Sequence, residues 1–576
     1  MKKNISILMA ALALTACGGD DLLENVSPTP TPEPTPDVVQ VPVRITADSG
    51  SPTAAKTRKV SGTDSGSELT FVWESTDGIE VFAGAQGMTR TVFTTLSSGA
   101  GTKSAEFSGT MSYDASANGD AALTDDTPVY SYIRNANLVY NADDRSVTMD
   151  LATQTGSLDD ALAHTLFWSE STYNGGDIHF KYVNQMAVLK LNIQNVGTES
   201  GTGTVTFMAD EGMPNSVTCS AKTGAVTPGT GKQVKATAVS FADGAATVYL
   251  AIVPNATSAI TRSEVRIDIN GRTFYQLFKN NSIAAGTLAG GYLYPQSVKK
   301  AKELKVGDVL YKDGTWSTKA EAIGHTKSEV LGIVGDINPT DEDVDAGYRH
   351  GYALYYEDLP EGKDYDWACE YLIDGIACYY RLVSTAFPDI SYPQLNIPRQ
   401  AVLTGADQAT VISYLEAEPS GLELSRLLYP LEVRGHVAYQ PARYAYGEWG
   451  ESPEEAATFT HSFLGTAGQM FKILRNLSIV DTTKTFSSTA GSYTDSWKWA
   501  NQNYTAQQNV ALSITCSDGA MAMNLQELGT VSKDYYWTTS EYDKNEAYAF
   551  YLQGNEVKFE AEQKTDKKSV RPLVAF

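Results

Sequence analysis

Alternating apolar and polar residues run through most of the first half of the chain. In the segment AVLKLNIQ, Leu189, Leu191 and Ile193 fall on one face and polar side chains on the other. The segment EVRIDINGRTFYQL alternates in the same way and is interrupted by Asn270-Gly271, a dipeptide that strongly favours a tight hairpin turn. A period of two residues is that of a half-buried β-strand, so these segments predict antiparallel strands with one face in a core.

Further strands of this kind are expected in LTFVWESTDGIEVFAG and ATVYLAIVP, with loops rich in Gly, Ser, Thr and Ala between them. Many short strands separated by such loops favour β-sandwiches. The length suits two tandem antiparallel sandwiches, and we expect them at residues 39–180 and 181–298.

The pattern changes from residue 299, where helices join the strands. KVGDVLYKDGTWS predicts a hairpin, and helices are expected at ATVISYLEAE, after a capping box at Ser452 and after a second one at Thr466. The last of these helices carries an apolar face made by Met470, Ile473, Leu474 and Leu477. Strands return in AYAFYLQG, EVKFEAE and SVRPLVAF. Residues 299–576 are therefore expected to form an α+β domain.

The N-terminus predicts export. Two lysines precede a short apolar stretch that ends in LTAC. This resembles the bacterial lipobox and implies a signal peptide, residues 1–16, and attachment of lipid, palmitate included, to Cys17. An ordinary signal peptide with a chance cysteine is the alternative. The GGDD that follows resembles a surface-export signal of outer-membrane lipoproteins, although a plain acidic spacer would look the same. Residues 17–38 contain SPTPTPEPTPD, in which alternate prolines favour an extended stalk.

Composition narrows the range of partners. The net charge of −24 disfavours nucleic acid. No apolar run approaches the ~20 residues of a transmembrane helix, so attachment to the membrane is expected through lipid alone. Besides Cys17, only four cysteines occur, which is too few for a disulfide scaffold in so long a chain. Cys369 and Cys378 are near enough in sequence to pair, and buried free thiols are the alternative.

No motif predicts catalysis, and we expect no enzymatic activity, cofactor or metal. The six histidines lack metal-binding spacing, and HExxH, GxSxG and phosphate-binding glycine loops are missing from the sequence. The acidic run at Asp341–Asp345 begins like a calcium loop. However, Ala346 stands where an EF-hand needs glycine, and Tyr352 where it needs glutamate. A solvated acidic loop is expected, and a looser calcium site stays open.

Three motifs resemble the fimbrillin-like family of pilus subunits. They are FVWESTDGIEVF, HFKYVNQMAVLKLNI and AGTLAGGYLYPQSV, which together cover about residues 40–298. The resemblance implies two transthyretin-like sandwiches. It also implies that an arginine-specific protease removes the first strand and that a neighbouring subunit donates a strand into the groove. Here the first strand would be VVQVPVRITA and the cut would follow Arg58, because Arg44 lies within the strand.

The last part of the chain resembles C-type-lectin-like domains. YWTTSE, VRPL and the opening VGD with KDG match motifs of that family, whereas SFLG stands where it has Trp-x-Leu-Pro. The calcium-and-sugar motifs are not matched, because Glu418-Pro419-Ser420 has the wrong third residue and no Trp-Asn-Asp occurs. The resemblance therefore implies the scaffold without that calcium chemistry.

Exposed aromatic rings are candidates for binding a sugar or a protein. We expect a ligand surface among Tyr535, Tyr536, Tyr542, Trp497 and Trp499. Trp537, Tyr548 and Phe550 alternate toward one face and are expected in the core.

Two functions fit these expectations. The first is a minor subunit and adhesin at the tip of a fimbria, exported to the outer membrane as a surface-exposed lipoprotein and assembled by strand exchange with other fimbrial subunits. An anchor position in the fimbria is not distinguished by sequence. The second is a permanently anchored lipoprotein that captures polysaccharide. The ligand, a protein or glycan on a host or bacterial surface, is not identified by the sequence.

Overall fold

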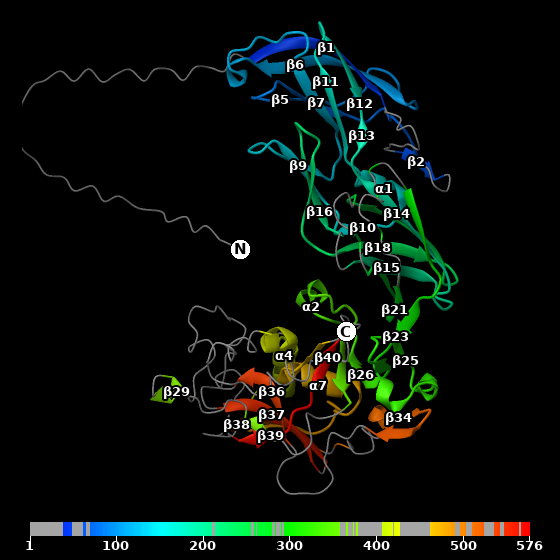
Figure 1. The fold of residues 1–576 in the computed structure, drawn as a ribbon, viewed down its shortest axis with the longest axis vertical. Helices are drawn as coiled ribbons and strands as arrows, with labels where there is room; N and C mark the ends of the chain where they lie inside the picture. The colour runs from blue at the N-terminus through cyan, green and yellow to red at the C-terminus, as the bar shows by residue number, and fades with distance from the viewer. Residues whose placement is uncertain are drawn as a thin grey trace, which may run out of the picture.

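The computed structural model contains three β-rich bodies that follow one another along the long axis of the molecule (Figure 1). Most strand pairs are antiparallel, so the predicted mainly β fold with several antiparallel sheets is confirmed. The structure describes residues 38–48, 61–64, 69–209, 213–254, 259–260, 262–278, 283, 288, 290, 293–356, 365–366, 372–373, 376–377, 406–418, 420–426, 461–489, 496–500, 502, 510–522, 535–541, 546–553, 555–563 and 566–576.

The first body packs two sheets around one core, with a separate hairpin of β2 (Ser61–Asp64) and β3 (Leu69–Val72). One sheet has the order β12-β1-β6 and the other β13-β11-β7-β4-β5. Their strands are β1 (Val38–Asp48), β4 (Ile79–Ala83), β5 (Thr89–Phe93), β6 (Ser104–Asp114), β7 (Pro128–Ile133), β11 (Phe167–Thr172), β12 (Asp177–Lys181) and β13 (Val183–Asn184). A short 3-10 helix, η1, spans Ser116–Asn118.

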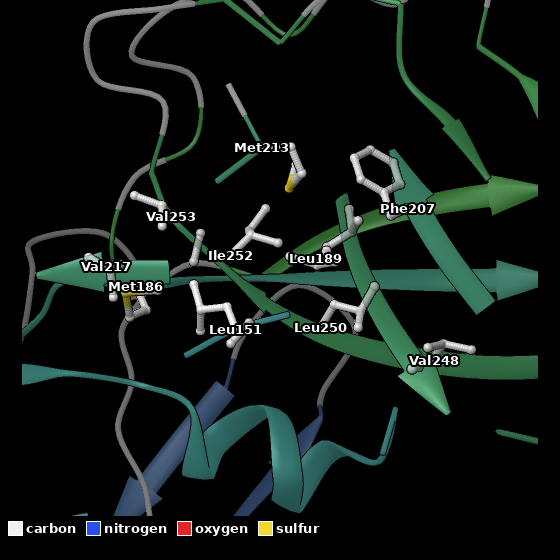
Figure 2. Close-up of a cluster of buried hydrophobic side chains, with 14 of the residues drawn as sticks. Leu151, Met186, Leu189, Phe207, Met213, Val217, Val248, Leu250, Ile252 and Val253 are labelled. Atoms are coloured by element: carbon white, nitrogen blue, oxygen red, sulfur yellow. The ribbon is translucent and has the colours of Figure 1, made fainter. Parts of the chain in front are cut away.

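The second body contains a six-stranded sheet β10-β18-β15-β20-β21-β23, a three-stranded sheet β19-β14-β22 and a four-stranded sheet β17-β16-β9-β8. Side chains from β14, β15 and β19 meet in its core, which Figure 2 shows around Leu189, Phe207 and Leu250. The strands are β8 (Leu138–Asn141), β9 (Ser146–Asp150), β10 (Thr153–Gln154), β14 (Ala187–Ile193), β15 (Gly201–Met208), β16 (Ser216–Ser220), β17 (Val226–Pro228), β18 (Gln233–Phe241), β19 (Ala246–Ile252), β20 (Glu264–Ile269), β21 (Arg272–Leu277), β22 (Leu293–Val298) and β23 (Lys302–Leu304).

Two local predictions in this body are confirmed. Leu189, Leu191 and Ile193 on β14 are each at most 1% exposed. The hairpin of β20 and β21 turns at Asn270 and Gly271, whose φ angles of 51° and 73° are the left-handed values that this tight turn requires. The alternation and the turn dipeptide therefore identify these strands correctly.

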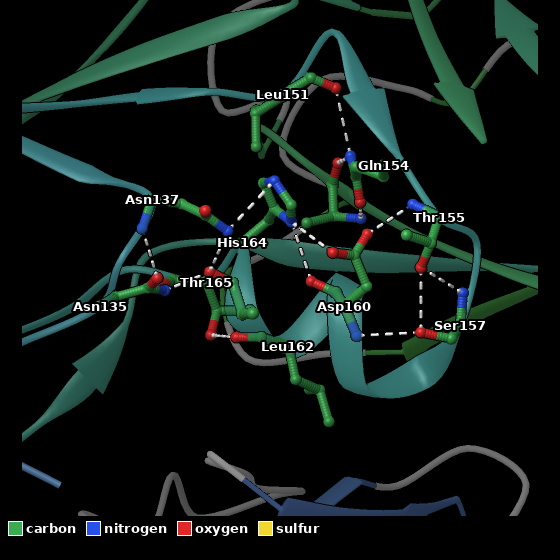
Figure 3. Close-up of polar contacts among 12 residues, drawn as sticks. Asn135, Asn137, Leu151, Gln154, Thr155, Ser157, Asp160, Leu162, His164 and Thr165 are labelled. Atoms are coloured by element: carbon green, nitrogen blue, oxygen red, sulfur yellow. Dashed lines mark hydrogen bonds and ion pairs between the residues drawn. The ribbon is translucent and has the colours of Figure 1, made fainter. Parts of the chain in front are cut away.

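The chain passes between the first two bodies more than once. Strands β8 and β9 follow β7 in sequence, yet β9 pairs with β16 of the second body. β10 then pairs in parallel with β18, and the short helix α1 (Leu158–Ala163; Figure 3) leads back to β11. The boundary at residue 180 stays a prediction. Residues 138–154 precede that boundary, but they belong to sheets whose other strands follow it.

The third body combines two sheets with helices, as the sequence predicts. The sheets have the orders β25-β24-β26-β27-β40-β31 and β32-β33-β38-β37-β36, with two small hairpins, β29-β30 and β34-β35, and a two-stranded pair of distant segments, β28-β39. The strands are β24 (Val309–Tyr311), β25 (Trp316–Ser317), β26 (Val330–Asp336), β27 (Tyr352–Tyr355), β28 (Tyr365–Asp366), β29 (Leu372–Ile373), β30 (Ile376–Ala377), β31 (His461–Phe463), β32 (Phe486–Thr489), β33 (Ser496–Trp499), β34 (Ser513–Cys516), β35 (Gly519–Ala522), β36 (Tyr535–Glu541), β37 (Glu546–Gln553), β38 (Glu556–Gln563), β39 (Lys567–Lys568) and β40 (Leu573–Ala575).

Three α-helices of this body, α2, α4 and α7, begin at polar caps. The α-helices are α2 (Asp341–Asp345), α4 (Gln408–Glu416) and α7 (Ala467–Asn476), and the 3-10 helices are η2 (Glu321–Gly324) and η3 (Lys327–Glu329). Thr466 and Gln469 form the predicted capping box of α7, and the apolar face predicted for this helix is buried. The other predicted box, at Ser452, lies outside the described residues.

The second and third bodies share an apolar joint. Met208 and Tyr275 of the second body cluster there with Val334 and Phe576 of the third. A buried hydrogen bond joins His350 Nε2 to Glu264 Oε1 at 2.8 Å, and the Tyr275 hydroxyl donates to the carbonyl of Arg349 at 3.2 Å. Apolar contacts and two buried hydrogen bonds therefore join the third body to the second.

Candidate functional site

The first strand lies in the middle of a sheet, between two strands that come much later in the chain. β1 pairs antiparallel with β6 over its whole length, from Val38 opposite Asp114 to Asp48 opposite Ser104. Its second half also pairs in parallel with β12, beginning with Arg44 opposite Asp177. The first half has only β6 as a partner among the described strands, and Val38 and Val39 are exposed.

Three alternate side chains anchor β1 in the core. Val43, Ile45 and Ala47 are 5%, 0% and 0% exposed. They join a cluster that includes Phe107 from β6 and Phe180 from β12. Without β1, the sheet would present an apolar groove with an unpaired strand edge on each side. Such a groove is what an extended segment with alternate apolar side chains can fill.

The outward side of β1 carries exposed polar pairs. Arg44 contacts Glu106 at 2.5 Å, and Asp48 contacts His179 at 2.7 Å. The hydrogen bonds from Arg44 and Ser98 hold the pKa of Glu106 below its usual value. Exposed ion pairs of this kind add little to stability, so the strand ladder and the three inward side chains hold β1 in place.

The C-terminal strand is built into its own sheet. β40 lies between β27 and β31, and residues 573–576 are each at most 1% exposed. The carbonyl of Phe576 accepts from the N–H of His350 at 2.7 Å, and the N–H of Phe576 donates to Gly351 at 3.2 Å. Withdrawing this strand would split the sheet and open the joint to the second body. Both β1 and β40 are therefore central strands of their sheets, and β40 also belongs to the joint with the second body.

Three of the predicted ligand-surface residues are in the core. Trp497, Trp499 and Tyr536 are 2%, 0% and 3% exposed. Trp497 stacks on Tyr548 at 4.9 Å between ring centroids, and Trp499 lies 4.9 Å from Phe471 of α7. A covered ring cannot stack on a ligand, so the prediction of a surface role for these three residues was wrong.

Tyr535 keeps its place as a candidate, and Tyr542 lies outside the described residues. Tyr535 is half-buried, with its hydroxyl donating to Glu560 at 3.1 Å and the Lys568 ammonium 4.5 Å from its ring centre. Trp537, Tyr548 and Phe550 are at most 3% exposed, which confirms the prediction that they belong to the core.

Glu418 has an internal role that the sequence did not indicate. Its carboxylate accepts from the N–H of Gly468 in the first turn of α7 at 2.5 Å and from the hydroxyl of Ser540 on β36 at 3.0 Å. It therefore ties the chain after α4 to both α7 and the second sheet. Burial raises the pKa of Glu418 to about 7, although these hydrogen bonds oppose the shift.

We expect the third body to lose stability as the pH rises from 5 to 8. The pKa of Glu418 is higher in the folded chain than in the unfolded one, so the folded state holds a proton that the unfolded state releases. At about 1.4 kcal/mol per pKa unit, the loss is on the order of 2–3 kcal/mol. Urea unfolding at both pH values, followed by tryptophan fluorescence, measures it.

The matched variant is Glu418→Gln, which keeps the shape and removes the titration. In Glu418→Gln, we expect the free energy of unfolding to fall less steeply with pH than in the unchanged chain. Some fall should remain, because burial also raises the pKa of Asp308, to about 6. A slope identical in Glu418→Gln and the unchanged chain would contradict the role given to Glu418.

The acidic run forms the short helix α2, which corrects the expectation of a loop. Thr340 caps its N-terminus by accepting from the N–H of Asp343, and acidic side chains in a first turn stabilise a helix. Asp343 is buried and accepts from the hydroxyls of Tyr352 at 2.5 Å and Ser420 at 2.7 Å. Among the residues that the structure describes, no group of three or more His, Cys, Asp or Glu side chains could hold a metal ion.

Several predictions concern parts of the chain outside the described residues. They include the signal peptide, lipidation of Cys17, the proline-rich stalk, cleavage after Arg58 and pairing of Cys369 with Cys378. Cys219 and Cys516 are described, and both are buried free thiols. Within the described ranges, no helix is both long and apolar enough to cross a membrane.

Sequence analysis missed the two walls of the β1 groove. DIHFK forms β12, in which Ile178 and Phe180 are buried and the residues between them are exposed. This alternation is legible in the sequence and would have identified the strand. Its parallel pairing with β1, more than a hundred residues away, has no local signal.

No family model matches the chain, and no curated protein matches it. Several solved structures are similar to parts or most of it. A fimbrial protein from Bacteroides ovatus shares 13% identity over 93% of this chain and 100% of its own, with a TM-score of 0.31. Candidate cell adhesion proteins from Bacteroides ovatus and Bacteroides uniformis share 12% and 14% identity over 46% of this chain and 97% of their own, with TM-scores of 0.32 and 0.29. Similarity at this level carries no conclusion about function.

Proposed function

We propose that the chain is a minor fimbrial subunit and adhesin that occupies the tip of a fimbria. It is exported as a lipoprotein on Cys17, and cleavage after Arg58 frees β1 and the lipid together. A neighbouring subunit then donates an extended strand into the groove between β6 and β12. The third body is carried outward as the recognition domain. The mature form resides in the fimbrium at the cell surface.

The contrast between β1 and β40 supports this proposal more than any other observation. β1 is held by two strand edges and three inward side chains, so an incoming strand with the same alternation can replace it. β40 is enclosed on both sides and ends in the buried Phe576. A subunit whose first strand can be replaced accepts a strand, and β40, which is built into its own sheet, is not available for donation. These two features favour a position at the end of a polymer. The three sequence motifs that resemble fimbrillin-like proteins agree with this role.

The processing step is tested with two arginine variants in the full chain. We expect an arginine-specific protease to release the N-terminal segment from the unchanged protein and from Arg44→Gln, but not from Arg58→Ala. In cells, Arg58→Ala should remain with the membrane and be absent from purified fimbriae. Normal incorporation of Arg58→Ala would contradict the mechanism. An unprocessed, membrane-bound protein that still captures polysaccharide would favour the alternative of a permanently anchored glycan-binding lipoprotein.

Excess of the subunit should also shorten fimbriae, because each copy that accepts a strand ends a polymer. The mean fimbrial length, measured by electron microscopy, should fall as expression rises. Labelling with an antibody against the third body should mark one end of each fimbria. Label distributed along the shaft would contradict the tip position.

A further inference from the structure

The three inward side chains of β1 differ in size along the strand. Val43, Ile45 and Ala47 follow one another in the core, and Ala47, the smallest, is fully covered. At the opposite end of the strand, Val38 and Val39 are 40% and 49% exposed. β1 is therefore most deeply enclosed at the end where its inward side chain is smallest.

Large side chains occupy the core beside Ala47. Its register partner on β12 is Phe180, and its partner on β6 is the small Ala105. The ring of Tyr182 lies 5.8 Å from that of Phe180 between centroids. The Tyr182 hydroxyl is hydrogen-bonded at 2.5 Å to the hydroxyl of Ser131, which lies on β7 in the facing sheet and is fully buried. This bond spans the two sheets and holds the tyrosine ring in place.

A tryptophan completes the packing at this end of β1. Trp73 packs edge-on against Tyr182 at 5.9 Å and against Phe107 of β6 at 5.6 Å, between ring centroids. Backbone hydrogen bonds join Trp73 to the turn just before β6, and β6 begins opposite Asp48, the residue after Ala47. Because protein cores are close-packed, a side chain larger than that of Ala47 would have to displace one of these rings.

The space at Ala47 distinguishes registers that the alternation of β1 alone does not. A slip of one residue turns every apolar side chain outward, whereas a slip of two residues keeps the alternation. With a slip of two in one direction, Ile45 would enter the space of Ala47 and meet the rings. With a slip of two in the other direction, Ala47 would take the space of Ile45 and leave a cavity. Crowding and cavities both cost stability, so a single register is favoured.

We infer that the space at Ala47 selects the strand that replaces β1. The donated strand must carry alanine or glycine there, two residues after a branched aliphatic side chain at the position of Ile45. The partner is therefore a subunit whose donated strand has a large apolar residue followed, two positions later, by a small one. This inference rests on the proposed function, because only an exchanged β1 leaves its place to another strand.

The test offers pairs of peptides to the full chain while an arginine-specific protease processes it. All peptides have the β1 sequence with Arg44→Gln, which removes their own cleavage site at an exposed position. One peptide of each pair is otherwise unchanged, and native mass spectrometry measures how much of each is bound to the processed chain. In the exchanged peptide, Ile45→Ala and Ala47→Ile together keep the composition and the alternation but move the small residue. We expect roughly tenfold less of the exchanged peptide to be bound, because an overpacked core weakens binding to about this extent.

Two single variants of the peptide separate size from position. Ala47→Leu should be bound roughly tenfold less than the unchanged sequence. Val39→Leu, at a position that is 49% exposed, should be bound equally. Equal binding of the exchanged peptide or of Ala47→Leu would overturn this inference and leave the proposed function standing. If none of the peptides is bound, the proposed function fails as well.

A second measurement uses the unprocessed chain, in which no strand has to be exchanged. Ala47→Leu should lower the unfolding temperature of the first body, and Val39→Leu should not. An unchanged unfolding temperature in Ala47→Leu would show that the rings give way and that the space is not restrictive. This result would contradict the inference whichever peptides are bound.

Discussion

Removing β1 is expected to unfold or strongly destabilise the first body, and a synthetic peptide with the β1 sequence should restore it. Loss of the strand removes Val43 and Ile45 from the core, which costs on the order of 4 kcal/mol in apolar burial alone. It also leaves the edges of β6 and β12 unpaired. Small domains have only about 5–15 kcal/mol of stability, so the loss is a large share of the total.

The experiment compares the chain that begins at Val38 with one that lacks residues 38–48. Differential scanning calorimetry should show that the unfolding transition of the first body occurs at a lower temperature in the shorter chain, or is missing. The peptide VVQVPVRITAD should restore it at concentrations above its dissociation constant. A peptide with Val43→Asp and Ile45→Asp should fail, because both side chains would point into the core.

Arg44→Gln in the peptide is the matched control, since Arg44 points outward and its side chain is 65% exposed. This peptide should restore the transition almost fully. If the shorter chain keeps its first transition without any peptide, β1 is not structurally required and the groove would not exist as described. If the Asp-substituted peptide works as well as the others, the inward alternation does not select the donor strand.

Short sequence patterns correctly predicted those elements whose conformation depends on interactions between nearby residues. The turn at Asn270-Gly271, the period of β14 and the capping box of α7 each depend on residues within a few positions of one another. They could be identified in one sequence because sterics and short-range hydrogen bonds decide them.

Long-range pairing could not be predicted in the same way. β1 pairs with β12 across about 130 residues, and β9 pairs with β16 across about 70. The residues of one strand do not indicate which distant strand it pairs with. The shared sheets of the first two bodies and the two strands on either side of β1 are consequences of such pairings. The sequence therefore indicated β1 as a strand, but not the two strands that pair with it.

The error over Trp497 and Trp499 has the same origin. In SWKW the two tryptophans alternate, so they must share one face of β33. Whether that face is open to solvent or covered depends on what packs on it. Here Tyr414 of α4 lies 6.2 Å from Trp497, and Phe471 of α7 lies 4.9 Å from Trp499. These helices cover the face, and tertiary packing turned a predicted ligand surface into core.

Trp499→Ala is accordingly expected to destabilise the third body by about 3–5 kcal/mol. The ring is fully buried between Phe471, Phe486 and Phe559, at 4.9, 5.2 and 6.4 Å between centroids, and its removal leaves a cavity that these rings cannot fill. Trp499→Phe should cost less, because the indole N–H has no hydrogen-bond partner within the described structure. Urea unfolding followed by circular dichroism measures both variants.

Tyr535→Ala distinguishes an effect on ligand binding by the third body's surface from an effect on the stability of its core. This side chain is half-buried at the edge of the second sheet, so its removal should cost much less than that of Trp499 and leave the body folded. If the third body recognises a ligand through its remaining aromatic surface, Tyr535→Ala should weaken that binding while the melting temperature changes little. A Trp499→Ala variant that keeps its melting temperature and loses only binding would show the opposite arrangement. The tryptophan would then face the ligand, and α7 would not cover it.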